Sequence, residues 1–318
     1  MLWLYILIFL ASCVLLYFAG NWVISGLMRT AKFLGWKEFV VAFFVMAFAA
    51  SLPNLFVGLS SAFHKIPQLS FGDIVGGNLV VLTIVVALAA LVAKGLPAGS
   101  RMVQTSSIFT ILIAILPLLL ILDGKLGRGD GILLILVFFL YIFWLFSKKE
   151  RFAKVYEGEI EPIAKEFKIF FKSLGKIIFG IILLLLAAEG IVRSAAFFAQ
   201  SLNLPLVLIG ILIVGLGNAL PETYFAVISA KKGETWMILG NLMGSVIVPA
   251  TLVLGIVALI CPIEIVDFSP FAIARFFLII SALFFLFFVR TGRKITRKEA
   301  LFLLLIYIAF VATEILTR

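Results

Sequence analysis

Apolar runs of about 20 residues recur along nearly the whole chain, and they restrict its fold more than any other feature. A run of that length crosses a bilayer as a helix, whereas a barrel strand needs only about 10 residues of alternating character. Charged residues make up 13% of the 318 residues, against roughly a quarter in soluble domains. Only helices and closed barrels satisfy their backbone hydrogen bonds in lipid. We therefore expect an all-α polytopic membrane protein.

Ten hydrophobic segments are expected to cross the membrane. A hydrophilic stretch follows the fifth segment and is too short to form a domain. The chain therefore divides into a first five-helix unit over 1–147, a cytoplasmic loop over 148–171 and a second five-helix unit over 172–318. The segments cover residues 2–28, 38–63, 70–93, 103–122, 130–147, 172–200, 204–230, 235–261, 269–289 and 299–317.

The basic residues orient these segments. Of the 26 Lys and Arg residues, 20 lie in the loops after segments 1, 3, 5, 7 and 9 or, as Lys172 and Lys176, directly beside one of them, and cytoplasmic loops carry the excess of positive charge. We expect the plasma membrane as the location, with both termini extracytoplasmic and the two units of opposite topology. The net charge of +10 is explained by this distribution, because the chain has no arginine-rich arm or basic helix for binding nucleic acid.

The N-terminal segment has one alternative interpretation. Residues 10–13 (Leu-Ala-Ser-Cys) resemble a bacterial lipoprotein cleavage site. The basic region of a signal peptide is missing, however, and the apolar run continues to Phe18. We expect an uncleaved first helix.

The two units contain an internal repeat with a constant offset. Ser51-Leu52-Pro53-Asn54 matches Ala219-Leu220-Pro221-Glu222, 168 residues later, and the same offset relates the glycine motifs at 72–78 and 240–246. Inverted repeats with Pro and Gly in mid-span indicate discontinuous helices that meet at a midplane site. Each proline removes a helical hydrogen bond, while Gly72, Gly76, Gly77, Gly240 and Gly244 allow a second helix to approach closely. The freed carbonyl oxygens suit hard cations.

In these motifs the chain resembles the calcium/cation antiporter superfamily, the sodium/calcium exchanger group. The signatures of that family read approximately Gly-Thr-Ser-Leu-Pro-Glu and Gly-Asn-x-x-Gly-Ser-Asn. The resemblance implies a cation-binding cluster between helices 2, 3, 7 and 8, with helices 1 and 6 sliding past it in alternating access. It implies inorganic cations such as Ca²⁺, Na⁺ or H⁺ as cargo, lipids as surroundings and no resident cofactor.

The ion site departs from the family pattern at several positions. The paired glutamates of the family fall on Asn54 and Glu222, so one carboxylate is replaced by an amide. Two further positions that usually hold Asn or Asp are Val81 and Pro249, and Asp73 stands where the family usually has Asn. The candidate cation ligands are Glu222, Asn54, Ser51, Ser245, Asp73, Asn218 and Asn241.

Two of the acidic residues have structural alternatives. Glu222 follows a helix-breaking proline in mid-span, where a bare carboxylate is costly, so we expect it to bind a cation or proton rather than only a neighbouring carbonyl. Asp73 lies in the ion path or serves as a charge at the start of its helix. Glu189 and Arg193 are four residues apart and are expected to form a structural ion pair. His64 is expected to be solvated in an external loop.

Two functions remain open on this sequence. The first is a secondary cation antiporter, because the chain contains no phosphate-binding loop for driving transport with ATP. The second is a non-transporting or regulatory relative that has lost the ion site, which the replacements at Asn54, Val81 and Pro249 suggest. We do not expect an enzyme, because the chain has one His and no pattern typical of a catalytic metal site.

Overall fold

The computed structural model describes residues 2–33, 51–146, 163–233, 235–265 and 269–317, and these are predominantly helical. Within this part of the chain nine helical stretches are long and apolar enough to cross a membrane. They correspond to nine of the ten predicted segments. Of the segment predicted over 38–63, helix α3 (Leu52–Phe63) is present, whereas 38–50 lies outside the described residues.

The elements follow one another in two series. The first consists of α1 (Leu2–Phe33), α3, α4 (Gln68–Val80), η2 (Val81–Val85), α5 (Val86–Val92), β1 (Leu96–Pro97), α6 (Arg101–Leu120), η3 (Ile121–Asp123), β2 (Lys125–Leu126) and α7 (Arg128–Phe146). The second consists of α8 (Ile163–Leu202), α9 (Leu206–Ile209), η5 (Gly210–Val214), α10 (Gly215–Asn218), α11 (Leu220–Lys232), α12 (Thr235–Val248), η6 (Pro249–Val253), α13 (Leu254–Ile260), β3 (Ile263–Glu264), α14 (Ser269–Thr291), β4 (Lys294–Ile295) and α15 (Arg297–Leu316).

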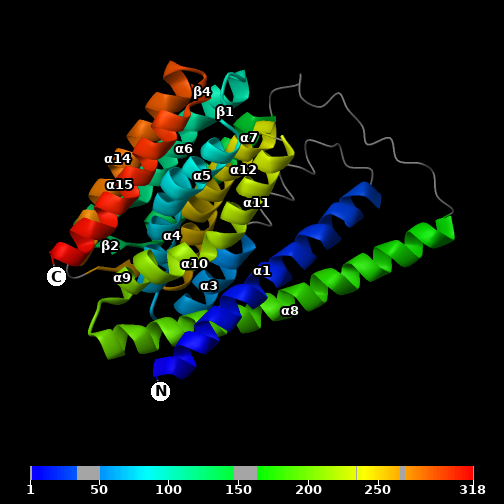
Figure 1. Cartoon of the computed structure of the whole chain (residues 1–318). Coiled ribbons are helices and arrows are strands. Elements are labelled where there is room, and N and C mark those ends of the chain that lie inside the picture. The colour runs from blue at the N-terminus through cyan, green and yellow to red at the C-terminus, as the bar shows by residue number, and fades with distance from the viewer. Residues whose placement is uncertain (1, 34–50, 147–162, 234, 266–268, 318) are drawn as a thin grey trace.

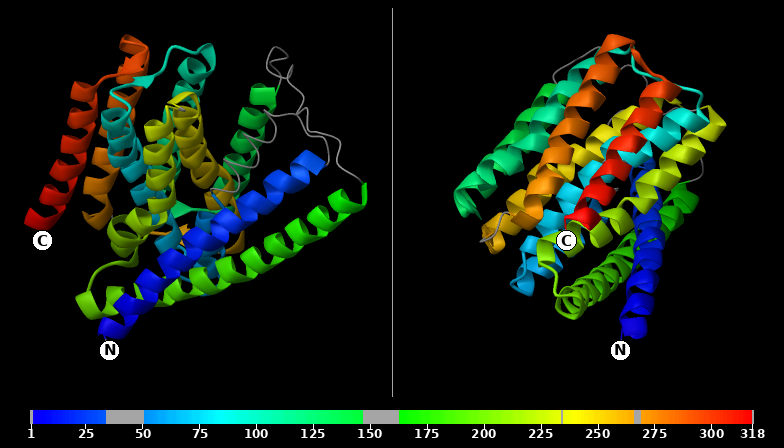
Figure 2. Two further views of the ribbon diagram at one scale, coloured as in Figure 1. Left: turned by 45° about the vertical axis from the view of Figure 1, so that its right-hand side comes forward. Right: turned by 60° about the vertical axis from the view of Figure 1, so that its left-hand side comes forward.

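Helices α1 and α8 lie side by side and cross the rest of the bundle obliquely, as Figures 1 and 2 show. Tyr5 stacks on Phe197 with 3.9 Å between ring centroids. A Cβ at Gly180 would lie 2.6 Å from the side chain of Val23. These contacts belong to a second buried apolar cluster, to which residues of α3, α4, α9 and η5 also contribute, beside the larger core of the main bundle. The structure therefore consists of a main bundle and an α1–α8 pair packed against it.

Helix α8 begins earlier than the sequence predicted. Residues 163–171 were assigned to the cytoplasmic loop, but they form the first turns of α8. The apolar run marks only the part of a helix that lies in lipid. Lys165 and Glu166 have helix propensities similar to those of apolar residues such as Leu. The helix can therefore continue beyond the apolar run. The loop residues 148–162 lie outside the described part of the chain.

The predicted break in the seventh segment is confirmed. Helix α10 ends at Asn218 and α11 begins at Leu220, with Pro221 in its first turn, where a missing N–H costs nothing. Pro53 has the same place at the start of α3. The backbone N–H of Leu55 donates to the Ser51 carbonyl at 3.0 Å, and Thr223 donates to Ala219 at 3.0 Å. These two bonds are related by the repeat offset.

The third and eighth segments each contain one π-helical turn at the same place in the repeat. Element η2 begins at Val81 and η6 at Pro249, which are 168 residues apart. Thr83 in η2 donates to the Leu79 carbonyl, and Thr251 in η6 donates to the Ile247 carbonyl at 2.6 Å. Proline alone does not produce the turn, because η2 has none. Single π-turns inside α-helices often mark functional sites.

Helix α4 packs very closely against the chain from α9 to α10. A Cβ at Gly72 would lie 2.1 Å from the Val207 carbonyl oxygen, and one at Gly76 would lie 2.2 Å from the Ile211 carbonyl oxygen. The close approach predicted for these two glycines is confirmed. A Cβ at Gly77 would be in ordinary contact, 3.8 Å from the Gly215 carbonyl oxygen. For Gly240, the counterpart of Gly72, no described atom lies within 4 Å.

Two short antiparallel ladders join the two halves of the chain. Strand β1 pairs with β4 at one end of the bundle, and β2 pairs with β3 at the other. The loops after the third and ninth segments therefore lie on one face, and those after the fourth and eighth on the opposite face, as an inverted repeat requires. Lys125 Nζ lies 2.8 Å from Glu264 Oε1, and this ammonium lowers the pKa of the exposed Glu264. Both termini lie toward the β2–β3 end (Figure 1).

We expect Gly76→Ala to destabilise the protein by about 1–3 kcal/mol or more, because the added methyl group would overlap backbone of η5 that cannot move aside like a side chain. Thermal unfolding of the purified protein in detergent measures the effect. Gly129→Ala is the matched control, because no atom lies within 4 Å of a Cβ built there. Equal melting temperatures for the two variants would contradict the close packing of α4.

Candidate functional site

A small buried cavity lies where the two repeats meet, with room for about one water-sized particle. Helices α3 and α4 with η2 line it from the first half, and α10, α11, α12 and η6 line it from the second. Its apolar walls are interrupted by several polar side chains. The lining residues are Asn54, Asp73, Ile74, Gly77, Asn78, Val81, Asn218, Ala219, Glu222, Ser245 and Pro249.

Three pairs of lining residues are related by the repeat offset of 168. They are Asn54 with Glu222, Gly77 with Ser245, and Val81 with Pro249. The cavity is thus close to the axis that relates the two repeats, and each pair differs in chemistry. Asn54 and Glu222 are both the third residue of a helix that begins at a proline turn. The repeat therefore places an amide and a carboxylate at equivalent points of one cavity.

Asp73 is held by a side chain from the opposite repeat. Asn218 Nδ2 donates to both carboxylate oxygens of Asp73, each at 2.9 Å, and lies 3.0 Å from Asn54 Oδ1. Asp73 is only 1% exposed. Hydrogen bonds to a charged group in such a place are strong because no water competes with them. Asn218 therefore connects α10 to both α3 and α4 at the wall of the cavity.

One carboxylate oxygen of Glu222 has no hydrogen-bond donor among the described residues. The Glu222 side chain is buried, and the oxygen without a donor is Oε2. It lies in the first turn of α11, where the helix dipole favours a negative charge. A buried carboxylate oxygen without a donor is costly unless it gains a proton or a cation. Glu222 is therefore available to bind either one.

The predicted ligands divide into two groups. Asn54, Asp73, Asn218, Glu222 and Ser245 all line the cavity. The Ser245 hydroxyl donates to the Leu242 carbonyl at 3.0 Å, which leaves its oxygen free to accept.

Ser51 and Asn241 do not line the cavity. Ser51 is buried at the residue before α3, and Asn241 lies half-buried on α12. Pro249 in η6 lines the cavity, so the eighth segment contributes to the cluster. Asp73 is the sixth residue of α4, so its alternative assignment to the helix start is wrong.

Sequence reasoning missed Asn78 as a candidate. It lines the cavity from α4 and is 3% exposed. The signal was present, because Asn78 ends the glycine motif that begins at Gly72. Within the described residues no three His, Cys, Asp or Glu side chains converge. The charge of the cavity therefore comes from Asp73 and Glu222 alone, with neutral oxygens around them.

Comparison with known proteins places this arrangement in a family. A family model described as sodium/calcium exchanger protein matches residues 4–147 and 172–316. The chain belongs to the sodium/calcium exchanger family. Each of the two matched stretches contains one copy of the repeat. Together they include every residue that lines the cavity.

Relatives and a solved structure match over nearly the full length. A membrane protein of Methanocaldococcus jannaschii is 28% identical over 307 residues, which is 96% of each chain. The sodium/calcium exchanger MaX1 of Methanosarcina acetivorans is 26% identical, again over 96% of each chain. The structure of the sodium/calcium exchanger NCX_Mj soaked with Na⁺ and Sr²⁺ is 26% identical, covers 98% of this chain and 99% of its own, and has a TM-score of 0.68.

Against the signatures of the exchanger family, the carboxylates of this cavity are rearranged. The position of one signature glutamate holds Asn54, yet a second carboxylate enters the same cavity from Asp73 on α4. Asn218 from the second repeat supplies the amide that binds this aspartate. The departures at Asn54 and Asp73 are therefore connected in space, because Asn218 contacts both side chains.

We expect Asn218→Ala to lower the free energy of unfolding by about 1–3 kcal/mol, because it leaves the buried Asp73 carboxylate without its donor. Thermal unfolding at neutral pH measures the loss. Asn241→Ala is the control, since Asn241 is an amide on a neighbouring helix that does not line the cavity. The pairing of Asn218 with Asp73 is refuted if both variants melt at the wild-type temperature.

Proposed function

We propose that the protein is a secondary active cation antiporter that exchanges calcium or another cation against sodium or protons by alternating access. The observation that carries the proposal is one cavity, at the meeting point of two inverted repeats, with two buried carboxylates in its wall. Buried acidic groups in a membrane bundle mark ion or proton pathways. The named relatives, an exchanger among them, support antiport as the class of reaction.

The charge of the cavity limits its cargo. Calcium takes about six to eight oxygen ligands, usually with several carboxylates among them. Here Asp73 and Glu222 provide two negative charges, which balance one divalent cation, or monovalent cations and protons of the same total charge. Asn54, Asn78, Asn218 and Ser245 add neutral oxygens. We therefore propose that each cycle moves fewer charges than a three-sodium exchanger and that protons compete with metal for the carboxylates.

Alternating access is assigned to the α1–α8 pair. This pair packs on the main bundle through α3 and η5, close to the elements that line the cavity. The ladders β1–β4 and β2–β3 involve neither α1 nor α8. A sliding movement of the pair would therefore leave the ladders intact while it covers one entrance and uncovers the other. Location in the plasma membrane with extracytoplasmic termini is part of the proposal, and the charge distribution of the loops supports it.

A second function is favoured by the apolar wall of the cavity. Val81 and Pro249 occupy the offset-related positions at the starts of the two π-turns and offer no side-chain ligand. A relative that keeps the fold without transporting ions is consistent with this replacement. Isothermal titration with Ca²⁺, Na⁺ and other cations distinguishes the two functions, because an inactive site binds none of them.

We expect Glu222→Gln to abolish exchange in liposomes loaded with Ca²⁺ and given an opposing Na⁺ or proton gradient. The amide keeps the shape of the side chain but removes the charge that holds a cation or proton. Flux of ⁴⁵Ca²⁺ or ²²Na⁺ measures the effect, and Glu299→Gln is the control because Glu299 is a half-buried capping residue of α15 that does not line the cavity. Wild-type exchange by Glu222→Gln would exclude this cavity as the ion site.

A further test moves the second carboxylate between helices. Asp73→Asn is expected to weaken cation binding or alter the choice of ion, because one of two charges is lost. Asn54→Glu alone is expected to raise affinity for divalent cations, because it brings a third carboxylate to the cavity. The double variant restores the charge count from α3 instead of α4, so it should bind cations more tightly than Asp73→Asn. Calorimetric titration measures all three, and identical affinities would contradict the assignment.

A further inference from the structure

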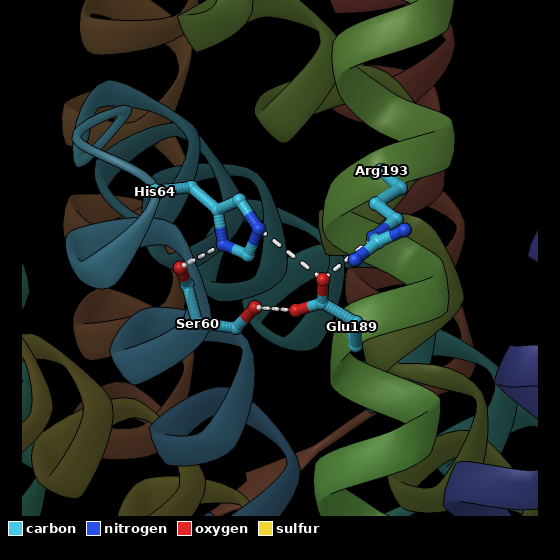
Figure 3. Close-up of polar contacts among 4 residues, drawn as sticks. All are labelled: Ser60, His64, Glu189 and Arg193. Carbon is cyan, nitrogen blue, oxygen red and sulfur yellow. Dashed lines mark hydrogen bonds and ion pairs between the residues drawn. The ribbon is translucent and has the colours of Figure 1, made fainter.

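A polar cluster outside the central cavity connects the main bundle to the α1–α8 pair. Figure 3 shows Ser60 and His64 from α3 facing Glu189 and Arg193 from α8. The Ser60 hydroxyl donates to Glu189 Oε2 at 2.9 Å. His64 Nε2 lies 3.2 Å from Glu189 Oε1, and Arg193 Nε donates to the same oxygen at 2.6 Å. The predicted ion pair of Glu189 with Arg193 is confirmed, whereas His64 is not simply solvated.

Both ring nitrogens of His64 face groups that accept hydrogen bonds. Nδ1 lies 2.8 Å from the backbone carbonyl oxygen of Ser60, which has no hydrogen to give. Nε2 faces the carboxylate of Glu189, which has no hydrogen to give while it is ionised. A neutral imidazole carries one N–H and would leave a lone pair against one of these oxygens. The geometry therefore suits a doubly protonated imidazolium.

The other groups around the cluster keep Glu189 ionised. Arg193 contributes a permanent positive charge in direct contact, and Ser60 donates to the remaining oxygen. Lys65 follows His64 in the chain. The proton between His64 and Glu189 is therefore best placed on the imidazole.

The neighbouring elements add no other ionised group to the cluster in the described part of the chain. Elements η6, α13, α9 and η5 contain no titratable side chain there. On α4, Asp73 faces the central cavity. On α1, Tyr5 stacks on Phe197 and Tyr17 packs against Tyr224. The state of the cluster thus depends on one exchangeable proton.

The location of the cluster determines the end of the bundle at which this proton can bind and leave. His64 ends α3 on the face that carries β2 and β3, where Gln68 donates to the Glu264 carbonyl at 3.0 Å. The side chains of His64 and Glu189 are 41% and 33% exposed, so neither is enclosed by protein. Histidine gains or loses its proton between about pH 5 and pH 8. A proton bound between the two side chains is therefore open to exchange at the β2–β3 end of the bundle.

We propose that His64 and Glu189 form a second proton-binding site, whose bound proton holds α8 to α3 and whose release frees the α1–α8 pair to move. The part that concerns movement rests on the proposed antiport. Proton binding itself does not, because the cluster is separate from the central cavity. With the proton bound, the imidazolium donates to the Glu189 carboxylate and the pair is held; without it, the neutral imidazole faces this carboxylate with a lone pair.

Nitrogen NMR of protein labelled with ¹⁵N-histidine tests the proton site directly, because His64 is the single histidine of the chain. At pH 7 the wild type is expected to show an imidazolium-to-imidazole ratio about threefold larger than Glu189→Gln, as for a partly exposed ion pair. Lys65→Gln is the control, because it removes a neighbouring charge but not the acceptor, and its imidazolium fraction should not fall. Equal fractions in wild type and Glu189→Gln would overturn the proposal.

Transport measurements test the second part. At saturating cation, where competition by protons in the central cavity is overcome, wild-type exchange should rise about threefold as the pH on the β2–β3 face goes from 6 to 8. His64→Gln should lose this rise because its neutral amide cannot titrate. Identical pH profiles for both proteins would refute the link to movement. A protein that exchanges no ion yet shows the NMR difference would refute the antiport proposal and leave the proton site established.

Discussion

A carboxylate inside a membrane bundle persists only where protein groups replace water, and this constraint governs the centre of the molecule. Asp73 meets it through Asn218, which reaches across from the opposite repeat. That reach depends on the separation of α4 from the α9–α10 chain, which Gly72 and Gly76 reduce to backbone contact. The stability of one buried charge thus depends on two glycines that have no functional side chain.

The repeats share a backbone plan but differ in side-chain chemistry. Proline turns, π-turns and threonine back-bonds recur at the same offset, and they shape the walls of the cavity. Charge does not recur: Glu222 has Asn54 as its counterpart, and Asp73 has Asn241, which lies outside the cavity. Each repeat contributes one carboxylate from a different helix. An inverted repeat can therefore keep its geometry while its electrostatics diverge, because backbone turns and ligand side chains are set by different residues.

Much of the fold could be predicted from the sequence, because lipid imposes simple rules on length and charge. The segments, the repeat and the break at Pro221 followed from apolar runs and proline chemistry. The π-turns could not, since hydropathy is the same for α- and π-helix at Val81. The pairing of Asp73 with Asn218 depends on distances between repeats that no single segment encodes. Pro67 marks the helix start at Gln68, and this sequence signal already places Asp73 beyond the first turn of the helix.

The two strand ladders also affect the order in which parts of the molecule unfold. They tie the two halves together on opposite faces, while α1 and α8 are held by a second apolar cluster, to which α3, α4, α9 and η5 also contribute, and by a few polar links. Segments that are held by fewer buried contacts unfold locally at a lower free-energy cost. On heating, the α1–α8 pair would detach first as one cooperative unit, and the laddered bundle would melt later. Backbone amide exchange would then show two classes of protection, divided by architecture rather than by position along the chain.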